Sequence, residues 1–278
     1  MQSGEGVETR PQGRVLVLGG TGHLGVDLVN RLLSAGRSVR VLSRNPGTDP
    51  RVQWVLGDLA DGEGLPIAMN GVSHVVHAAT NSPIARRGSL SWSDLWHSPA
   101  DVDLDGTRRI LDLADKHAIE HLLFVSIVGL EDSKLPYSRV KLAGEALVRA
   151  SPLSWSVIRA TPYFYLVERM LDRMHRWPIW VLPDAPFQPV DTRDVADHLV
   201  ASLEGKTRGM LPEIGGPELI SYADMARAHL RARGISKRVV DLRIPEGLAR
   251  QGGMVRAAGI HGVRTWEQWL AEQTAGIA

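Results

Sequence analysis

Three polar residues in the middle of the chain have the types and spacing needed for acid–base chemistry. Tyr137 and Lys141 stand four residues apart, and Ser126 precedes them at the end of an apolar run. A separation of four places the phenol and the ammonium on one face of a helix. The ammonium favours the phenolate, so we expect it to lower the pKa of Tyr137 from about 10 and make the phenol usable nearer neutrality. Ser126 would hold the oxygen of a substrate.

A glycine-rich segment near the start of the chain has the pattern of a loop that binds a nucleotide diphosphate. Its glycines follow the apolar run 15–18 and open an amphipathic stretch that ends near Gly36. In such a unit the first glycine permits a tight turn, the second lets backbone approach pyrophosphate, and the third lets helix pack on strand. Without the flanking strand and helix, the same glycines would fit an ordinary turn. The expected cofactor contacts are Gly19, Thr21, Gly22, His23, Leu24 and Gly25.

Strands alternate with helices over the first 160 residues. The expected strands are 15–18, 38–43, 51–56, 72–79, 121–126 and 155–159. The expected helices are the stretch from Val26 to about Gly36, 101–117 and 136–150. This α/β order predicts a doubly wound parallel sheet, the Rossmann fold, with ligands beyond the carboxyl ends of the strands. That position favours chemistry at Tyr137 and Lys141 over the alternative of a surface tyrosine and a solvated lysine.

The pattern changes after residue 160. Prolines and aromatic residues interrupt 162–189, and shorter elements follow: a helix at 192–203, a strand near 210–214, a helix capped by Ser221 and a closing segment at 265–270. We therefore divide the chain into a Rossmann core, 13–160, and a small C-terminal substrate-binding lobe with further elements, 161–278, packed on the same domain. Because the lobe lacks a regular run of strands, we do not expect a separate domain. Residues 1–12 are polar, and we expect them to be disordered.

Two residues after the second expected strand indicate which dinucleotide binds. An acidic residue at this point would bind the ribose hydroxyl of NAD, whereas this chain has Ser43 and Arg44. A guanidinium can hold a 2′-phosphate through charge-assisted hydrogen bonds, each worth about 1.5 to 3 kcal/mol. We expect NADP(H), the alternative being a solvated arginine in a turn. Arg40 lies within the strand and is a weaker candidate.

Further cofactor contacts are expected after the third and fourth strands. Asp58 and Leu59 follow the third strand, where the carboxylate faces either the adenine edge or the turn that it would cap. Ala78, Ala79 and Thr80 follow the fourth strand and would line the cofactor through small side chains and backbone.

Composition limits the classes of function. The chain has 32 Lys and Arg against 31 Asp and Glu, with no basic cluster, so nucleic acid is not an expected partner. The absence of cysteine excludes thiolate catalysis and disulfides. No signal-peptide core and no apolar run of about 18 residues is present, which predicts a cytoplasmic protein without membrane contact.

No metal site is expected. The histidines at 23, 77 and 97 lack metal-ligand spacing. The aspartates at 191, 194 and 197 recur every third residue, as at the acidic start of a helix.

Several motifs together resemble the short-chain dehydrogenase/reductase superfamily, in the extended and atypical branch that includes NmrA-like and triphenylmethane-reductase-like proteins. The motifs are GGTGHLG at 19–25, GDL at 57–59, VVHAAT at 75–80, DLDGTRRILDLA at 103–114, VSIVGLEDSKLPYSRVKLAGEALV at 125–148, SVIRATPYF at 156–164, FQPVDTRDVADHLV at 187–200, IGGPE at 214–218 and the terminal RTWEQWL. The resemblance implies that Ser126, Tyr137 and Lys141 match the catalytic serine, tyrosine and lysine. It also implies that Lys141 contacts the nicotinamide ribose and that Pro162 and Tyr163 lie near the nicotinamide.

The chain departs from the family pattern at two points. Asp103 stands where extended members carry asparagine, which alters the water relay that this asparagine supports. The interval between Ser126 and Tyr137 is also shorter than in many members.

The residues favour an NADPH-dependent reductase in which Tyr137 gives a proton to the developing alkoxide of a carbonyl or quinone. Aromatic residues suggest a bulky, apolar and polycyclic substrate from secondary metabolism, with contacts at Trp92, Trp96, Phe164 and Trp180. One alternative is a non-catalytic redox sensor of NmrA-like type. Another is direct hydride reduction of a C=C or C=N bond without Tyr137. The protein would be a monomer or a homodimer.

Overall fold

Strands and helices alternate through the first half of the computed structural model, which describes residues 13–87, 89, 91–205, 207–244 and 258–275. The expected disordered start, 1–12, lies outside the described residues. The strands are β1 (Val15–Leu18), β2 (Val39–Ser43), β3 (Gln53–Leu56), β4 (His74–His77), β5 (His121–Ile127), β6 (Trp155–Ala160), β7 (Ile179–Asp184), β8 (Pro186–Phe187), β9 (Gly209–Met210), β10 (Ile214–Gly215), β11 (Ile220–Ser221), β12 (Arg238–Arg243) and β13 (Ile260–His261). The helices are α1 (His23–Ser34), α2 (Leu65–Met69), α3 (Pro83–Arg87), α4 (Gly106–Ala114), α5 (Pro136–Ala150), α6 (Phe164–Arg173), α7 (Thr192–Glu204), α8 (Tyr222–Ala232) and α10 (Trp266–Ala275).

The central sheet is parallel, and its strands run in the order β13-β10-β6-β5-β4-β1-β2-β3, with β9 beside β6. The chain changes direction across the sheet between β1 and β4, so a crevice opens beyond the carboxyl ends of these two strands. This arrangement confirms the predicted doubly wound fold.

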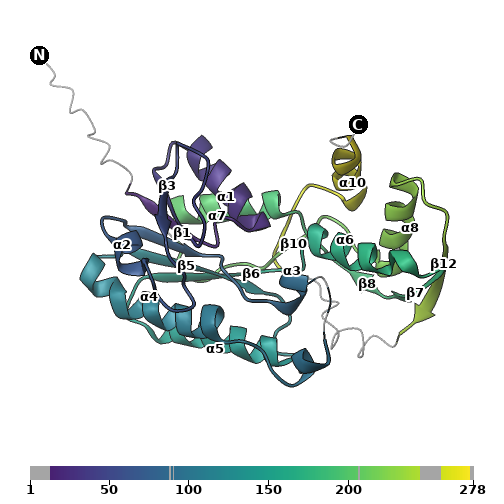
Figure 1. Cartoon of the computed structure of the whole chain (residues 1–278), viewed down its shortest axis with the longest axis horizontal. Helices are drawn as coiled ribbons and strands as arrows, with labels where there is room; N and C mark the ends of the chain where they lie inside the picture. Colours follow the sequence, from purple (N-terminus) through teal and green to yellow (C-terminus); the bar gives the residue numbers. More distant parts are fainter. Residues whose placement is uncertain (1–12, 88, 90, 206, 245–257, 276–278) are drawn as a thin grey trace, which may run out of the picture.

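Helices cover both faces of the sheet (Figure 1). Figure 1 shows α1 and α7 on one face and α4 and α5 on the other. Alternate residues of β1 serve the two faces: Val15 and Val17 join Leu28 of α1, whereas Leu16 joins Ile110 of α4. Each fully buried side chain of this size stabilises the fold by about 1.5 to 3 kcal/mol relative to exposure. Apolar residues on both faces explain why β1 reads as a continuous apolar run.

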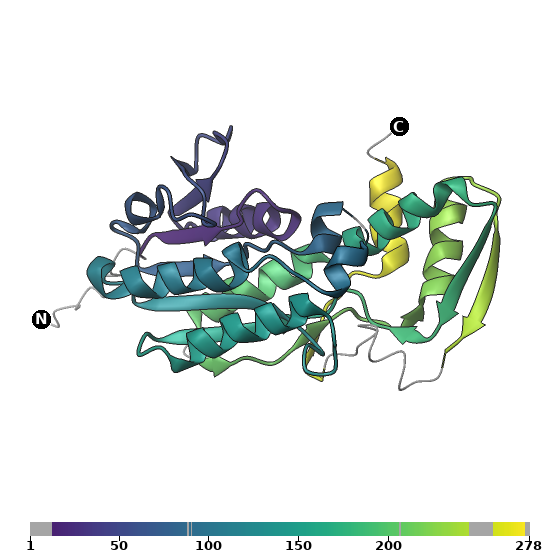
Figure 2. The ribbon, with the colours of Figure 1, turned by 60° about the horizontal axis from the view of Figure 1, so that its bottom comes forward.

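A lobe with its own apolar core lies beyond one end of the sheet, as Figure 2 shows for α6, α8, β7, β12 and α10. Two two-stranded sheets belong to it, a parallel pair of β7 with β12 and an antiparallel pair of β8 with β11. These four strands were not among the elements expected from the sequence. The cause is separation along the chain, because α8 stands between the paired strands β7 and β12.

The C-terminal half also completes the Rossmann core. Strands β9, β10 and β13 extend the central sheet, and α7 packs on α1. Asp191 caps α7 by accepting a hydrogen bond from the Arg193 amide at 2.8 Å. Asp194 accepts hydrogen bonds from the backbone amides of Val263 and Arg264 at 2.9 and 3.0 Å, which ties the last segment to this helix.

Three buried histidines make stability sensitive to acid. Burial lowers the pKa of His77 to about 3 and the pKa values of His121 and His229 to about 4. In the unfolded chain a histidine binds a proton below about pH 6.5, so the unfolded state binds more protons in the interval down to about pH 4. Each histidine then lowers the free energy of unfolding by about 1.4 kcal/mol per pH unit as the pH falls through that interval.

Urea unfolding at pH 7.5, 6.5, 5.5 and 4.5 checks this prediction. His121→Leu should flatten the decline in the free energy of unfolding, whereas the same change at the exposed His97 should leave its slope unaltered. A decline of equal slope in both variants would show that His121 does not carry the effect.

Candidate active site and dinucleotide loop

The glycine loop between β1 and α1 is shaped by close backbone contacts. Gly19 has a φ of +87°, and a Cβ at this position would lie 2.6 Å from the Ala79 nitrogen. A Cβ on Gly25 would lie 2.0 Å from the Gly19 carbonyl oxygen, whereas one on Gly22 would meet that oxygen only at 3.4 Å. Gly19 and Gly25 therefore hold the turn against β4 and α1. A Cβ on Gly22 would not clash with the protein itself. Glycine at this position therefore fits a site where a bound ligand, and not the protein, requires the absence of a side chain.

Aromatic rings stand beside the first turn of α1. His23 stacks on Tyr165 with ring centroids 3.8 Å apart, and Tyr165 is stacked on Tyr163 at 5.8 Å. Burial, followed by the charge of Arg169, lowers the pKa of His23 and favours its neutral ring. Burial raises the pKa of Tyr165 to about 12. A cleft of about 450 Å³ lies between the start of α1, α6, the start of α7 and α10, and Thr21, Gly22, His23 and Tyr165 are among the residues that line it.

The two residues proposed to select the dinucleotide differ in exposure. Arg44 is exposed directly after β2, while the buried Ser43 hydroxyl accepts a hydrogen bond from the Asn45 amide at 3.3 Å. Arg40 is buried and donates to Gln53 and to the carbonyl oxygens of residues 67, 68 and 70. Arg40 therefore stabilises the end of α2, whereas Arg44 is exposed.

The residues after β3 have structural roles. The Asp58 carboxylate accepts a hydrogen bond from the Ala60 amide at 3.0 Å and so caps the following turn, the alternative noted for it above. The Leu59 side chain is buried in the core beneath α4, next to Gly106. Any contact of Leu59 with a cofactor would come from its backbone.

Tyr137 lies in a hydrogen-bonded group of side chains at the carboxyl edge of the sheet. Its phenol oxygen is 2.7 Å from the Thr80 hydroxyl, which donates to the Asp103 carboxylate at 3.1 Å. Asp103 also accepts from the Asn81 amide at 2.9 Å and from the Lys141 ammonium at 2.9 Å. The group therefore joins the end of β4, the first turn of α5 and the segment before α4.

The ion pair of Lys141 with Asp103 is shielded from solvent. The exposed fractions of the two side chains are 4% and 0%. The Lys141 ammonium also lies 4.6 Å from the centroid of the Phe124 ring. A π-helical turn, η2 (Asp101–Asp105), precedes α4 in place of the regular helix expected from 101, and it contains Asp103. The ammonium proposed to contact a ribose is thus paired inside the protein.

Two expectations for this group change in the structure. Burial and the Asp103 carboxylate raise the pKa of Tyr137 well above its usual value, so the expected lowering by Lys141 was wrong. The reason is that Asp103 neutralises the ammonium and stands close to the phenol. Thr80, expected only to line the cofactor, is the residue whose hydroxyl contacts the Tyr137 phenol, while the buried Ser126 hydroxyl has no hydrogen-bond partner among the described residues.

The aromatic residues proposed to meet a substrate lie in three different surroundings. Trp180 is fully buried in the lobe, where its indole donates to the Trp177 carbonyl at 3.2 Å. Phe164 is buried against Trp266 and Trp269. Both therefore belong to the apolar core of the lobe, and Phe164 also lines the cleft beside the glycine loop. Trp92 and Trp96 are each 84% exposed.

Pro162 and Tyr163 directly follow β6. Their backbone holds the lobe to the core: the Pro162 carbonyl accepts from the Val190 amide at 3.0 Å, and the Val190 carbonyl accepts from the Phe164 amide at 3.0 Å. The Tyr163 side chain remains partly exposed.

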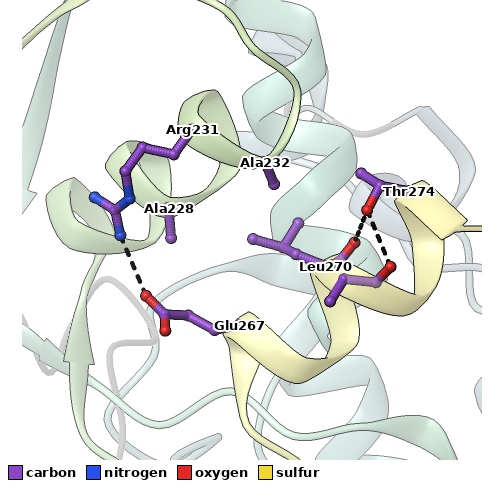
Figure 3. A pocket seen from close by; sticks show the side chains of 7 residues that line it. Ala228, Arg231, Ala232, Glu267, Leu270 and Thr274 are labelled. Carbon is purple, nitrogen blue, oxygen red and sulfur yellow. Dashed lines mark hydrogen bonds and ion pairs between the residues drawn. The ribbon is translucent and has the colours of Figure 1, made fainter.

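A second hollow lies between α8 and α10 in the lobe (Figure 3). Figure 3 shows Arg231 paired with Glu267 across it, while Thr274 donates to the carbonyl oxygens of its own helix. The other residues drawn there are alanines and Leu270. Apart from the paired Arg231 and Glu267, the residues that line this hollow have no group suited to acid–base chemistry. The glycine loop and Tyr137 therefore define the candidate site.

In the described part of the chain, no group of histidines and acidic residues is arranged to hold a metal ion. The three spaced aspartates have structural partners instead, since Asp197 pairs with Arg31 of α1 at 2.7 Å. A search of the described helices also finds none with the length and apolar character needed to cross a bilayer.

A parallel sheet in this strand order, with a glycine loop at its switch point, defines a dinucleotide-binding protein of short-chain dehydrogenase/reductase type. The profile of an NAD(P)H-binding family matches residues 19–205, so the chain belongs to that family. The comparisons support an NAD(P)H-binding oxidoreductase.

Curated relatives include two kinds of protein. A Photosystem II assembly factor, Ycf39, of Cyanophora paradoxa is 27% identical over 241 residues, which span 83% of this chain and 71% of that one. The corresponding proteins of Trieres chinensis and Guillardia theta are matched over 59% and 64% of their lengths. A decarboxylating sterol-4-alpha-carboxylate 3-dehydrogenase of Bos taurus is 33% identical over 114 residues, which span 41% of this chain and 30% of that one.

Solved structures share the fold over almost the whole chain. A UDP-glucose 4-epimerase of Thermotoga maritima has a TM-score of 0.74 at 17% identity, covering 95% of this chain and 98% of that one. A short-chain dehydrogenase/reductase superfamily protein of Agrobacterium tumefaciens with bound NAD has a TM-score of 0.70 at 20% identity, covering 95% of this chain and 96% of that one. At these identities the likeness is one of fold.

Proposed function

We propose that the protein is an NADPH-dependent oxidoreductase that acts on a carbonyl or quinone of a bulky apolar substrate, with Tyr137 as the proton donor. The observation that carries the proposal is the position of the Tyr137 phenol at the carboxyl edge of the sheet, bonded to Thr80, in a chain with a glycine loop for pyrophosphate. A phenol there is placed to protonate an oxygen as negative charge develops on it.

The cofactor would be held by groups at the same edge of the sheet. The backbone of Gly22 and His23 at the start of α1 would meet the pyrophosphate, and the exposed Arg44 would meet a 2′-phosphate. When bound, NADPH would supply the hydride. The pKa of Tyr137 lies well above neutrality, so the phenol carries its proton at working pH and can donate it.

The substrate class is supported by relatives and by the cleft. The curated relatives with matches to this chain include dehydrogenases named for sterols and 3β-hydroxysteroids, which are polycyclic alcohols. Tyr165 lines the cleft beside the glycine loop and stacks on Tyr163. A polycyclic ketone or quinone fits these features.

Arg44→Ala is expected to weaken binding of NADPH about ten- to a hundredfold and to leave NADH binding within about twofold of wild type. The reason is loss of one or more charge-assisted hydrogen bonds of about 1.5 to 3 kcal/mol, where 1.4 kcal/mol is a factor of ten. Fluorescence titration of both cofactors at fixed ionic strength measures the change. Arg139→Ala, on the exposed side of α5, is the matched control. Equal losses for NADPH and NADH would contradict the role of Arg44.

A second candidate function is a dinucleotide sensor that signals through a protein partner. It is favoured by the assembly-factor relatives, whose matches span most of this chain, and by the exposed Trp92 and Trp96. A sensor would bind NADPH and NADP with similar affinity and would not consume NADPH.

One experiment separates the two functions. NADPH oxidation is followed at 340 nm with a panel of polycyclic ketones and quinones, while calorimetry measures the affinities for NADPH and NADP. Turnover with any member of the panel that follows Michaelis–Menten kinetics supports the oxidoreductase. Tight binding of both cofactors with no turnover across the panel would favour the sensor.

A further inference from the structure

A continuous line of hydrogen bonds connects the Tyr137 phenol to a buried carboxylate. It runs from the Tyr137 oxygen to the Thr80 hydroxyl over 2.7 Å, then to the Asp103 carboxylate over 3.1 Å, and ends at the Lys141 ammonium over 2.9 Å. Thr80 is exposed and Asp103 is fully buried, so the line leads from the open side of the site to the interior.

The number of hydrogens fixes the direction of each bond in this line. A carboxylate paired with an ammonium accepts hydrogen bonds and donates none, so the single Thr80 hydroxyl hydrogen points to Asp103. The Thr80 oxygen is then an acceptor toward Tyr137, and the phenol must donate its own hydrogen to Thr80. A phenol hydrogen directed elsewhere would leave two lone pairs facing each other across 2.7 Å.

We propose that Thr80 and Asp103 form, with Tyr137, a proton relay in which Asp103 is the terminal proton acceptor and donor. The inference rests on the proposed function of Tyr137 and adds the route of its proton. It also assigns to Asp103 the work of the water relay expected from asparagine at this position.

The relay conserves protons at each step. When an alcohol is oxidised, its O–H bond breaks and an O–H bond forms on Tyr137, the phenol hydrogen passes to Thr80, and the Thr80 hydrogen passes to Asp103. When a carbonyl is reduced, a protonated Asp103 gives its hydrogen to Thr80, Thr80 gives one to Tyr137, and Tyr137 gives one to the substrate oxygen. After reduction, Asp103 is left as a carboxylate paired with Lys141, which is the state that the structure shows. Between turnovers Asp103 exchanges its proton with solvent through the exposed Thr80.

Lys141 has a positioning role in this relay. Its ammonium holds Asp103 and leaves one carboxylate oxygen for Thr80 and the Asn81 amide. Ser126 has no contact with the relay, because its hydroxyl is buried without a hydrogen-bond partner in the described structure.

Neutron diffraction from a perdeuterated crystal tests the relay without any substrate. We expect one deuterium on the Tyr137 oxygen pointing to Thr80, one on Thr80 pointing to Asp103, and none on the Asp103 carboxylate. A Thr80 deuterium that points to Tyr137 would overturn the relay. The result stands whether or not a substrate is turned over, so failure of the relay and failure of the proposed function are told apart.

Kinetics test whether the line carries protons or only positions Tyr137. Thr80→Val removes the hydroxyl at constant shape and should lower kcat about 100-fold with unchanged KM and NADPH affinity, whereas Thr80→Ser should stay within about threefold of wild type. Combining Thr80→Val with Tyr137→Phe should cause no further loss beyond Tyr137→Phe alone, because both act on one proton. Thr207→Val, an exposed threonine far along the chain, is the matched control. Wild-type kcat in Thr80→Val, or losses that multiply in the double variant, would contradict the relay.

Discussion

Tyr137→Phe is expected to lower kcat by about 10²- to 10⁴-fold, the usual contribution of general acid–base catalysis, and to leave NADPH affinity within about twofold of wild type. The substitution removes the only atom of the phenol that meets Thr80 and keeps the ring in place. Steady-state kinetics with a substrate found in the carbonyl panel measure kcat, and fluorescence titration measures cofactor affinity.

Tyr222→Phe is the matched control for this prediction. Tyr222 is partly buried in the lobe, and its hydroxyl donates to the sulfur of Met170 at 3.5 Å. This variant should keep wild-type kcat. A Tyr137→Phe variant that turned over substrate as fast as wild type would show that the phenol is not the acid, and would favour hydride transfer without a tyrosine.

Gly22→Ala is expected to weaken NADPH binding by about 100-fold while the fold stays intact. A methyl group there would meet the Gly19 carbonyl oxygen only at 3.4 Å, so the chain accommodates it, but it would stand where backbone is proposed to approach the pyrophosphate. Loss of about two charge-assisted hydrogen bonds accounts for the size of the effect. Calorimetry measures NADPH affinity, and thermal unfolding reports the fold.

Two other glycines give this prediction its controls. Gly25→Ala should lower stability as well as affinity, because its methyl group would lie 2.0 Å from the Gly19 oxygen. Gly36, at the far end of α1, has a φ of +74° and open space around it, so Gly36→Ala should cost about 1 kcal/mol of stability without changing NADPH affinity. Unchanged NADPH affinity in Gly22→Ala would contradict the proposed position of the pyrophosphate.

The Rossmann core was predictable because its signals are local. Residues 15–18 form a continuous apolar run, and the helix from Pro136 to Ala150 matches its expected bounds. Pairing in the lobe was not predictable in the same way. Strand β7 reads Ile-Trp-Val-Leu, an unbroken apolar run in which exposed Ile179 and Val181 alternate with buried Trp180 and Leu182. The face that each residue takes is decided by α8 and β12, which follow much later in the chain.

The sequence predicted which residues belong to the candidate site, but it could not predict which contacts they make with one another. Spacing by four placed Tyr137 and Lys141 on one helix, but it could not show that Asp103, 38 residues before Lys141, pairs with the ammonium. The same limit applies to Thr80. It was expected to line the cofactor through its backbone and small side chain, but its hydroxyl forms a hydrogen bond with Tyr137, 57 positions away. Aromatic composition could not separate Trp180, which is buried in the core of the lobe, from Trp92, which is exposed at the protein surface.

The most direct test of the proposed function is the fate of the hydride from [4-²H]NADPH, labelled on each face in turn, with a polycyclic ketone from the panel. We predict deuterium on the carbinol carbon of the alcohol product from one labelled face, and a rate of this transfer lowered by about 10²- to 10⁴-fold in Tyr137→Phe. Deuterium at the carbon of a former C=C or C=N bond, or binding of NADPH without transfer to any ketone, would contradict the account.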